Sequence, residues 1–133
     1  MCLRKINIRV RYSETDQMGY VYYGIYAQYF EVARVEFLRD LGIRYKDLEL
    51  KGIALPVVNY NINYKHPAYY DDNLEIQTKI SDIKKYKIIF KYETYNEEKT
   101  LLNVAETSLV FINMKTRKPC VLPDIIFKKL NKE

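Results

Sequence analysis

Apolar and polar residues alternate over several stretches of the chain, and a period of two is the pattern of a half-buried β-strand. In the stretch INIRVRY (6–12), apolar residues take the even positions and polar residues the odd ones. Four further strands are predicted over residues 55–65, 73–83, 86–95 and 101–114. The stretches 73–83 and 86–95 alternate in the same way, whereas 101–114 is apolar on both faces near its end, as expected of a central strand. The stretch NEEK (96–99) is expected to join the last two as a hairpin.

The period of the pattern changes after residue 21. Large apolar residues and one alanine then recur at spacings of three or four, and these form one helical stripe: Tyr26, Phe30, Ala33, Phe37 and Leu41. Gly42 follows where a C-terminal helix cap is expected. We therefore predict one long helix that begins near Tyr22. Val32 and Val35 lie off the stripe, so this helix is apolar over more than one face and is expected to be wrapped by other elements.

The order of predicted elements is a strand, a long helix, four strands with antiparallel alternation, and a short helix over 123–130 with Pro123 near its first position. This order predicts an α+β fold in which a curved antiparallel five-stranded sheet surrounds one long central helix. No repeat or linker interrupts the 133 residues, and residues 1–133 are interpreted as a single domain.

Composition narrows the class of protein. Hydrophobic residues make up 48% of the chain, which argues against disorder. Cys2 and Cys120 lie far apart and outside any CxxC pattern, as is typical of a reducing compartment. The start, MCLRKINIRV, has no apolar signal segment, and no stretch is long enough to span a membrane. We therefore expect a cytoplasmic protein.

The net charge of +5 can attract partners that carry phosphate or carboxylate groups, or can serve solubility alone. Fourteen tyrosines beside lysines could indicate stacking on nucleic-acid bases. Most of these tyrosines fall in phase with a strand or the helix, however, so packing explains them more simply. We expect no nucleic-acid partner.

Asp16 and Gly19 stand directly before the predicted helix. One interpretation is structural, because loop aspartates cap turns and loop glycines take a positive φ. The other is an active site. The N-terminus of a helix presents free N–H groups that can bind an oxyanion, and a glycine lets a substrate approach the backbone. Asp16 could then attack a polarised carbonyl or activate a water molecule.

Other catalytic patterns are missing from the sequence. His66 is the single histidine, so a metal site with several histidines is excluded, and it is interpreted as a loop residue beside Pro67. There is no GxSxG motif, no phosphate-binding GxxxxGK[ST] loop and no GxGxxG. We predict no metal and no cofactor.

Two groups of basic residues remain. Lys84, Lys85, Lys87 and Lys91 cluster around one strand start, and Arg117-Lys118 precedes a turn proline. These residues could be solvated charges on turns and edges. They could also be point charges for the phosphates of coenzyme A (CoA).

A longer pattern resembles a known family, the hotdog-fold acyl-CoA thioesterases of the 4-hydroxybenzoyl-CoA thioesterase type, including the branch associated with the Tol–Pal system. The resemblance covers almost the whole chain. It is carried by Tyr12, Thr15, Asp16, Gly19, Val21, Tyr22, Tyr23 and Tyr26, then by Phe30, Ala33, Arg34 and Glu36. The stretches YKHPAYYDDNLEI (64–76) and RKPCVLPD (117–124) also resemble family segments.

The resemblance implies roles. Asp16 would be the catalytic carboxylate, as nucleophile or general base, and Tyr23 would offer its backbone N–H to the thioester oxygen. The central helix would be fully buried. Two chains would join their sheets edge to edge with active sites at the interface, often with two such dimers forming a tetramer. Water would cleave an acyl thioester, of CoA or of an acyl carrier protein, without metal or redox cofactor.

The chain departs from the family at two positions. The Tol–Pal branch usually has histidine where this chain has Tyr23, and the usual glycine of the Pro-Ala segment is Asp71. Other functions stay open. One is a protein that binds acyl-CoA or a carrier protein without turnover. Another is a hotdog hydratase, which would need a histidine beside a carboxylate, whereas His66 lies in a different segment from Asp16.

Overall fold

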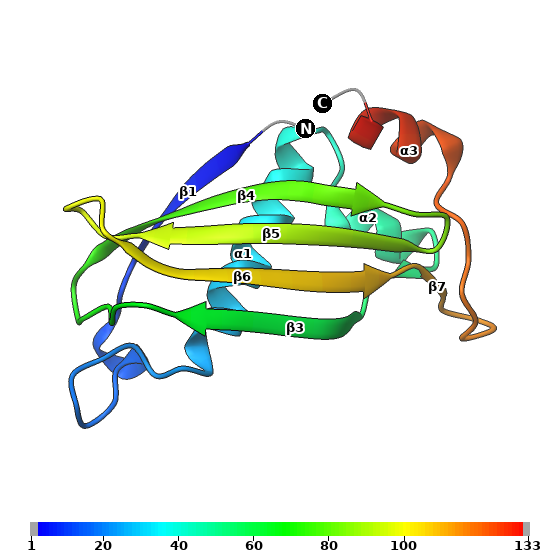
Figure 1. Ribbon diagram of the computed structural model, residues 1–133. Helices are drawn as coiled ribbons and strands as arrows, with labels where there is room; N and C mark the ends of the chain where they lie inside the picture. The colour runs from blue at the N-terminus through cyan, green and yellow to red at the C-terminus, as the bar shows by residue number, and fades with distance from the viewer. Residues whose placement is uncertain (1–2, 132–133) are drawn as a thin grey trace.

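The computed structural model describes residues 3–131 (Figure 1). Its elements along the chain are β1 (Arg4–Arg9), the 3₁₀ turn η1 (Tyr12–Glu14), α1 (Ile25–Asp40), α2 (Tyr45–Leu50), β2 (Ile53–Ala54), β3 (Val57–Tyr64), β4 (Asn73–Ile83), β5 (Lys87–Tyr95), β6 (Leu101–Val110), β7 (Ile112–Asn113) and α3 (Asp124–Asn131). Among the helices of this described part, none is long and apolar enough to cross a bilayer.

Five strands form one sheet in the order β1-β4-β5-β6-β3, and every neighbouring pair is antiparallel. Figure 1 shows this sheet in front of α1, with β1 at one edge and β3 at the other. The two short strands β2 and β7 pair separately. The predicted fold, a five-stranded antiparallel sheet around one helix with a short C-terminal helix, is confirmed.

The core lies between α1 and the inner face of the sheet. Phe30 stacks on Tyr92 with ring centroids 4.5 Å apart, and Phe37 meets Phe90 edge to face at 5.7 Å. All four side chains are essentially fully buried. Each contributes about 1.5–3 kcal/mol through burial, and these offset or edge-on ring geometries add to that term. The helical stripe therefore fixes which side of α1 faces the sheet.

Helix α1 is shorter than predicted. It has 16 residues and begins at Ile25, because the backbone N–H of Tyr22 donates to Glu14 O at 2.9 Å and so belongs to the preceding loop. The expectation of a fully buried helix is also wrong for the single chain: Val32 is 47% exposed. A five-stranded sheet covers one side of a helix, and the opposite side of α1 is left open.

Two strand boundaries and one short helix differ from the prediction for local reasons. The first strand ends at Arg9, because Tyr12–Glu14 forms a 3₁₀ turn. The stretch 101–114 divides into β6 and β7, since the N–H of Phe111 donates to Tyr86 O outside the ladder. Helix α2 was not predicted, because its single buried residue, Leu48, leaves no periodic pattern to detect.

Candidate active site

The loop before α1 is a narrow hairpin held by backbone hydrogen bonds. The N–H of Asp16 donates to Tyr20 O at 2.9 Å, and the N–H of Tyr22 donates to Glu14 O at the same distance. The N–H of Val21 donates to Ala68 O at 2.8 Å, which ties the loop to the segment after β3. The backbone around Asp16 is therefore constrained at both ends of the hairpin.

The carboxylate of Asp16 is only partly used by this hairpin. Its Oδ1 accepts the N–H groups of Met18 at 2.9 Å and Tyr20 at 3.2 Å, so the predicted Asx turn is present. Within residues 3–131, no donor forms a hydrogen bond with Oδ2. The structural and the catalytic interpretations of Asp16 are therefore compatible, because one oxygen holds the loop while the other is left for chemistry.

Gly19 is required by the backbone rather than by close approach of a ligand. Its φ is +81°, a conformation that residues with a side chain rarely adopt, and its N–H donates to Asp16 O at 2.9 Å. A Cβ at this position would meet nothing within 4 Å. Gly19 thus closes the turn that presents Asp16.

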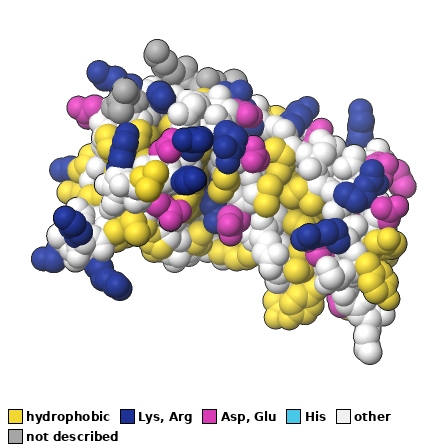
Figure 2. All heavy atoms as spheres, turned by 180° about the vertical axis from the view of Figure 1, so that it is seen from behind, with side chains coloured by type: hydrophobic (Ala, Val, Ile, Leu, Met, Phe, Trp, Pro, Cys, Tyr) yellow, Lys and Arg dark blue, Asp and Glu magenta, His cyan; other side chains and the backbone are white. Residues whose placement is uncertain are grey.

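Asp16 lines a cavity of about 320 Å³ between the loop, the start of α1 and the end of β3. The lining residues, mostly aromatic or aliphatic, are Asp16, Met18, Tyr20, Val21, Tyr23, Tyr26, Tyr64, Lys65, His66 and Pro67. Hydrophobic side chains, drawn in yellow, also gather around this loop at the lower right of Figure 2. A carboxylate in an apolar, concave setting is the usual composition of a small-molecule site.

The two residues directly before α1 offer free backbone donors beside this cavity. The N–H of Ile25 is bonded to Tyr22 O, but no acceptor within the described chain takes the N–H of Tyr23 or of Gly24. The Tyr23 side chain is 66% exposed and its carbonyl accepts the Tyr64 hydroxyl at 3.3 Å. Such free N–H groups at a helix start can bind an oxyanion.

Glu14 is a functional candidate that the sequence reasoning missed. It is 5% exposed and accepts the Tyr29 hydroxyl at 2.7 Å, the Arg11 backbone N–H at 2.9 Å and the Arg11 guanidinium at 2.7 and 3.0 Å. Burial alone would raise the pKa of Glu14, but these hydrogen bonds together hold that pKa below its ordinary value. Because Tyr29 belongs to α1, Glu14 anchors the Asp16 loop to the helix.

His66 is a loop residue beside Pro67, as predicted, and it also lines the Asp16 cavity, which the sequence did not indicate. It follows β3, which ends beside the loop, and the N–H groups of Lys65 and His66 both donate to Leu102 O. Fifty residues separate His66 from Asp16 in the sequence. Only the path of β3 across the sheet brings them to one site, so no local signal could have found this proximity.

Asp71 takes the place of the family's usual glycine without disturbing the backbone. Its φ is +69°, in the left-handed region that glycine favours and aspartate tolerates. Its N–H donates to Val10 O at 3.0 Å, and its carbonyl accepts the Arg9 guanidinium at 2.7 Å. This departure therefore preserves the turn that supports the wall of the cavity.

The basic residues expected to bind CoA lie away from Asp16 within one chain. Lys84 and Lys85 lie in the β4–β5 turn and Lys87 is the first residue of β5. This turn lies at the opposite end of the sheet from the Asp16 loop in Figure 1. The register agrees, since Lys87 pairs with Val110 near the start of β3, whereas the cavity is at the end of β3.

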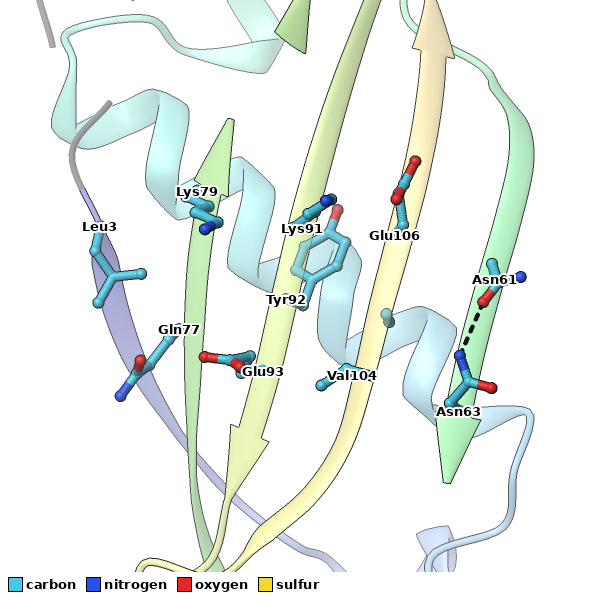
Figure 3. Close-up of a pocket in the computed structure, with 11 residues that line it drawn as sticks. Leu3, Asn61, Asn63, Gln77, Lys79, Lys91, Tyr92, Glu93, Val104 and Glu106 are labelled. Carbon is cyan, nitrogen blue, oxygen red and sulfur yellow. Dashed lines mark hydrogen bonds between the residues drawn. The ribbon is translucent and has the colours of Figure 1, made fainter. Parts of the chain in front are cut away.

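Lys91 and the Arg117-Lys118 pair are placed differently again. Lys91 stands on the outer face of the sheet, between Lys79 and Glu106, on the side away from α1 (Figure 3). Arg117 and Lys118 lie in the connection between β7 and α3. The structure therefore does not gather the six predicted basic residues into one cluster. As for metals, the described residues contain no group of three or more His, Cys, Asp or Glu placed to hold an ion.

Comparisons with known proteins show the family of this chain. The family model described as thioesterase-like superfamily matches residues 10–130. A putative acyl-CoA thioesterase, YneP of Bacillus subtilis, is 40% identical over 119 residues, which cover 90% of this chain and 86% of that protein. An acyl-CoA thioester hydrolase, YbgC of Escherichia coli, is 37% identical over 90% of this chain and 89% of that protein.

Among solved structures, a DHNA-CoA thioesterase from Staphylococcus aureus superposes with a TM-score of 0.93 at 35% identity, covering 99% of this chain and 93% of that chain.

Proposed function

Because the chain belongs to the thioesterase-like superfamily, we propose that it hydrolyses acyl-CoA thioesters to a carboxylic acid and free CoA. The relatives named above act on acyl-CoA or DHNA-CoA thioesters by their names. One observation of the chain itself carries the proposal. Asp16 keeps one carboxylate oxygen without a protein partner, in an apolar cavity beside the free N–H groups of the α1 start.

The reaction follows from these groups. The thioester carbonyl oxygen would accept hydrogen bonds from the N–H groups of Tyr23 and Gly24, which stabilise the negative charge that develops there. Asp16 Oδ2 would either take a proton from the attacking water or attack the carbonyl carbon to form an anhydride that water then opens. In both routes the C–S bond breaks and CoA leaves as its thiolate, which takes up a proton. Water supplies the new oxygen of the carboxylic acid.

We propose a homodimer in which two β3 strands pair, and a tetramer of two such dimers as the larger assembly. Strand β3 is bonded to β6 on one side only, and its residues are exposed along most of its length. An open edge with Val57, Val58, Tyr60 and Tyr64 exposed is a template for another strand. A monomeric mass by light scattering at micromolar concentration would contradict this assembly.

Such a dimer gives the β4–β5 lysines a role at the site. Antiparallel pairing of β3 places the Val57 end of the partner strand beside the Tyr64 end of the first strand, where the Asp16 cavity lies. Three strand spacings then separate β3 from the partner's β5, roughly 14 Å. The extended pantetheine arm of CoA spans such a distance. Lys84, Lys85 and Lys87 from the partner would therefore meet the CoA phosphates.

Two other functions predict different results. A hotdog hydratase is favoured by one observation, His66 in the same cavity as Asp16, and it would add water to an enoyl thioester without releasing thiol. A non-catalytic binder would hold acyl-CoA or an acyl carrier protein with no turnover. We also propose a cytoplasmic location, supported by the free thiol of Cys120.

A thiol-release assay over short, long and aromatic acyl-CoAs and one acyl carrier protein tests the proposal. We expect release with at least one substrate, together with loss of the thioester absorbance. Loss of enoyl-CoA absorbance without thiol release would support the hydratase. Saturable binding of every substrate without release would support the binder. Either result would overturn the proposed hydrolysis.

A further inference from the structure

A second cavity, of about 220 Å³, lies between α1, the start of β3 and β6. Ala27, Glu31 and Arg34 of α1 form one wall, and Val57 and Tyr60 of β3 form another. Thr107 of β6 lines it as well. The walls are mainly apolar, and the polar groups come from a few residues, which is the composition of a ligand site.

Arg34 is the unusual member of this cavity. It is 9% exposed, and its Nε is buried without a hydrogen-bond partner. Within the described residues no ion pair links its guanidinium to a carboxylate, and Glu31 in the same cavity is exposed to solvent. Arg34 thus remains charged and buried with a donor left over.

Glu31 is the carboxylate that shares the cavity with Arg34, but among the described residues no ion pair joins the two. Burial raises the pKa of Tyr92, and both the charge of Arg34 and a hydrogen bond with Arg34 oppose that rise, so part of the guanidinium already meets the Tyr92 hydroxyl. The Tyr92 hydroxyl is already bonded to Thr107 Oγ1 at 2.7 Å. Neutral hydroxyls do not compensate a buried cation, and an unsatisfied buried donor is costly. A ligand oxygen in the cavity would place an acceptor beside the guanidinium that lines it.

The cavity lies next to the Asp16 site along the seam between α1 and β3. Tyr26 and Tyr64 line the Asp16 cavity, whereas Ala27 and Tyr60 line the second one. Tyr26 and Glu31 are about 7.5 Å apart along the helix axis. Tyr64 and Tyr60 are roughly 13 Å apart along the strand. These are the dimensions of a small acyl group extending from the thioester.

We propose that this cavity receives the distal end of the acyl group, and that Arg34 selects acyl groups with an oxygen acceptor at that end. This inference rests on the proposed thioester hydrolysis and names the substrate class of the same site. The acceptor is a hydroxyl oxygen or a carboxylate, and both accept hydrogen bonds from a guanidinium. Arg34 is then a specificity-determining residue that does not take part in the bond-breaking step.

Two matched substrate pairs test the proposal, each differing by one oxygen-bearing group. The hydroxyl arm compares 4-hydroxybenzoyl-CoA with benzoyl-CoA, and the carboxylate arm compares glutaryl-CoA with valeryl-CoA. We expect the protein to favour the oxygen-bearing member by at least tenfold in kcat/KM in one arm, which also identifies the acceptor. The absence of a preference in both arms would overturn the proposal without any variant.

Arg34→Met removes the charge and keeps a side chain of similar length. We expect the preference to fall below about threefold, while kcat/KM for the apolar member stays within about threefold of the parent. Arg39→Met is the matched control, since Arg39 is on the same helix but exposed, and it should keep the parent's preference. Equal losses for both members of a pair, or an unchanged preference, would contradict the assignment.

Two further measurements keep the test decisive. If Arg34→Met does not fold, Arg34→Lys retains the charge on a shorter stem and should retain part of the preference. Conversion of a dimer to a monomer by Arg34→Met would show that a second copy supplies the acceptor, and would overturn the proposal. If the parent hydrolyses no member of the panel, the proposed hydrolysis fails, and calorimetric binding of the four free acids to parent and variant still decides the role of Arg34.

Discussion

Glu14 and Asp16 stand two residues apart in one loop, yet their carboxylates have opposite situations. Glu14 is buried, and both of its carboxylate oxygens accept hydrogen bonds, which come from Arg11 and Tyr29. Asp16 is partly exposed to a cavity and uses one oxygen for its own turn. A chemically similar group is therefore structural at one position and available for reaction at the other.

The difference arises from which donors surround each group. The 3₁₀ turn directs Glu14 toward α1, where the Tyr29 hydroxyl meets it. Asp16 lies at the turn that Gly19 closes and points to the mouth of the cavity lined by Tyr23 and Tyr64. A carboxylate with every acceptor site occupied cannot attack a substrate or take a proton. The difference supports a structural role for Glu14 and is the basis of the catalytic role proposed for Asp16, and substitutions test both roles.

The largest effect is expected for Asp16→Asn. The amide keeps the acceptor for Met18 and Tyr20 but has no basic or nucleophilic oxygen, so we expect kcat for the best acyl-CoA to fall about a hundredfold or more. The thermal midpoint should change little. Asp40→Asn, at the exposed end of α1, is the control that should retain full activity. Parent-like turnover by Asp16→Asn would remove the catalytic assignment.

Glu14→Ala should act first on stability. The buried Tyr29 hydroxyl would lose its acceptor, and we expect the free energy of unfolding to fall by about 2–3 kcal/mol, measured by urea denaturation. Glu14→Gln keeps an acceptor for Tyr29 and should lose less. If both variants were as stable as the parent and turned over substrate normally, the anchoring role of Glu14 would be wrong.

The lowered pKa of Glu14 makes its contribution depend on pH. A carboxyl group whose pKa is lowered by folding contributes to the stability of the folded protein. This contribution is complete at pH values above the pKa in the unfolded chain, near 4.5, and is lost as the pH falls through the pKa in the folded protein. We expect the parent to lose more stability than Glu14→Gln between about pH 5 and pH 3. The pKa of Asp47 is lowered as well, by its hydrogen bonds with Arg44. Because Asp47 is present in both proteins, its effect on stability cancels when the two are compared. Parallel stability curves would contradict the prediction.

A smaller effect is expected at the far end of the sheet. Replacing Lys84, Lys85 and Lys87 together by Gln should raise KM for acyl-CoA by about three- to tenfold with little change in kcat, the signature of lost uniform binding. The increase should be larger at low salt, because screening weakens phosphate contacts. Lys99→Gln, in the β5–β6 turn, is a control for the loss of one positive charge at the other end of the sheet, to be compared with each single Gln variant of the three lysines. An unchanged KM would support the alternative interpretation, that the three lysines are solvated surface charges.

The smallest effect is expected for Tyr23→Phe, which we expect to keep kcat within about twofold. The proposed donor at this position is the backbone N–H, which the substitution keeps, and the side chain is largely exposed. Stopped assays at saturating substrate measure this directly. If the hydroxyl were itself the donor, its removal would cost roughly 3 kcal/mol in the transition state. A loss of kcat comparable to that of Asp16→Asn would make the phenol a catalytic group.

Local pattern by itself determined most of this protein's architecture. The period of two located β1, β4 and β5, and an apolar run located β6. The stripe from Tyr26 to Phe37 located the buried side of α1. These patterns are readable because burial on one face leaves a repeat in the sequence. Asp16 and Gly19 were identified by their spacing before a helix and by the family resemblance they carry.

Only the tertiary structure decided what each group is available to do. Glu14 and Tyr29 meet because a loop packs on a helix, and His66 reaches Asp16 because β3 ends beside that loop. Arg34 lies on the buried stripe side of a helix, and nothing in its sequence neighbours shows that its Nε lacks a partner. Hydrogen-bond satisfaction depends on groups distant in the chain, and a pattern of neighbouring residues does not encode it.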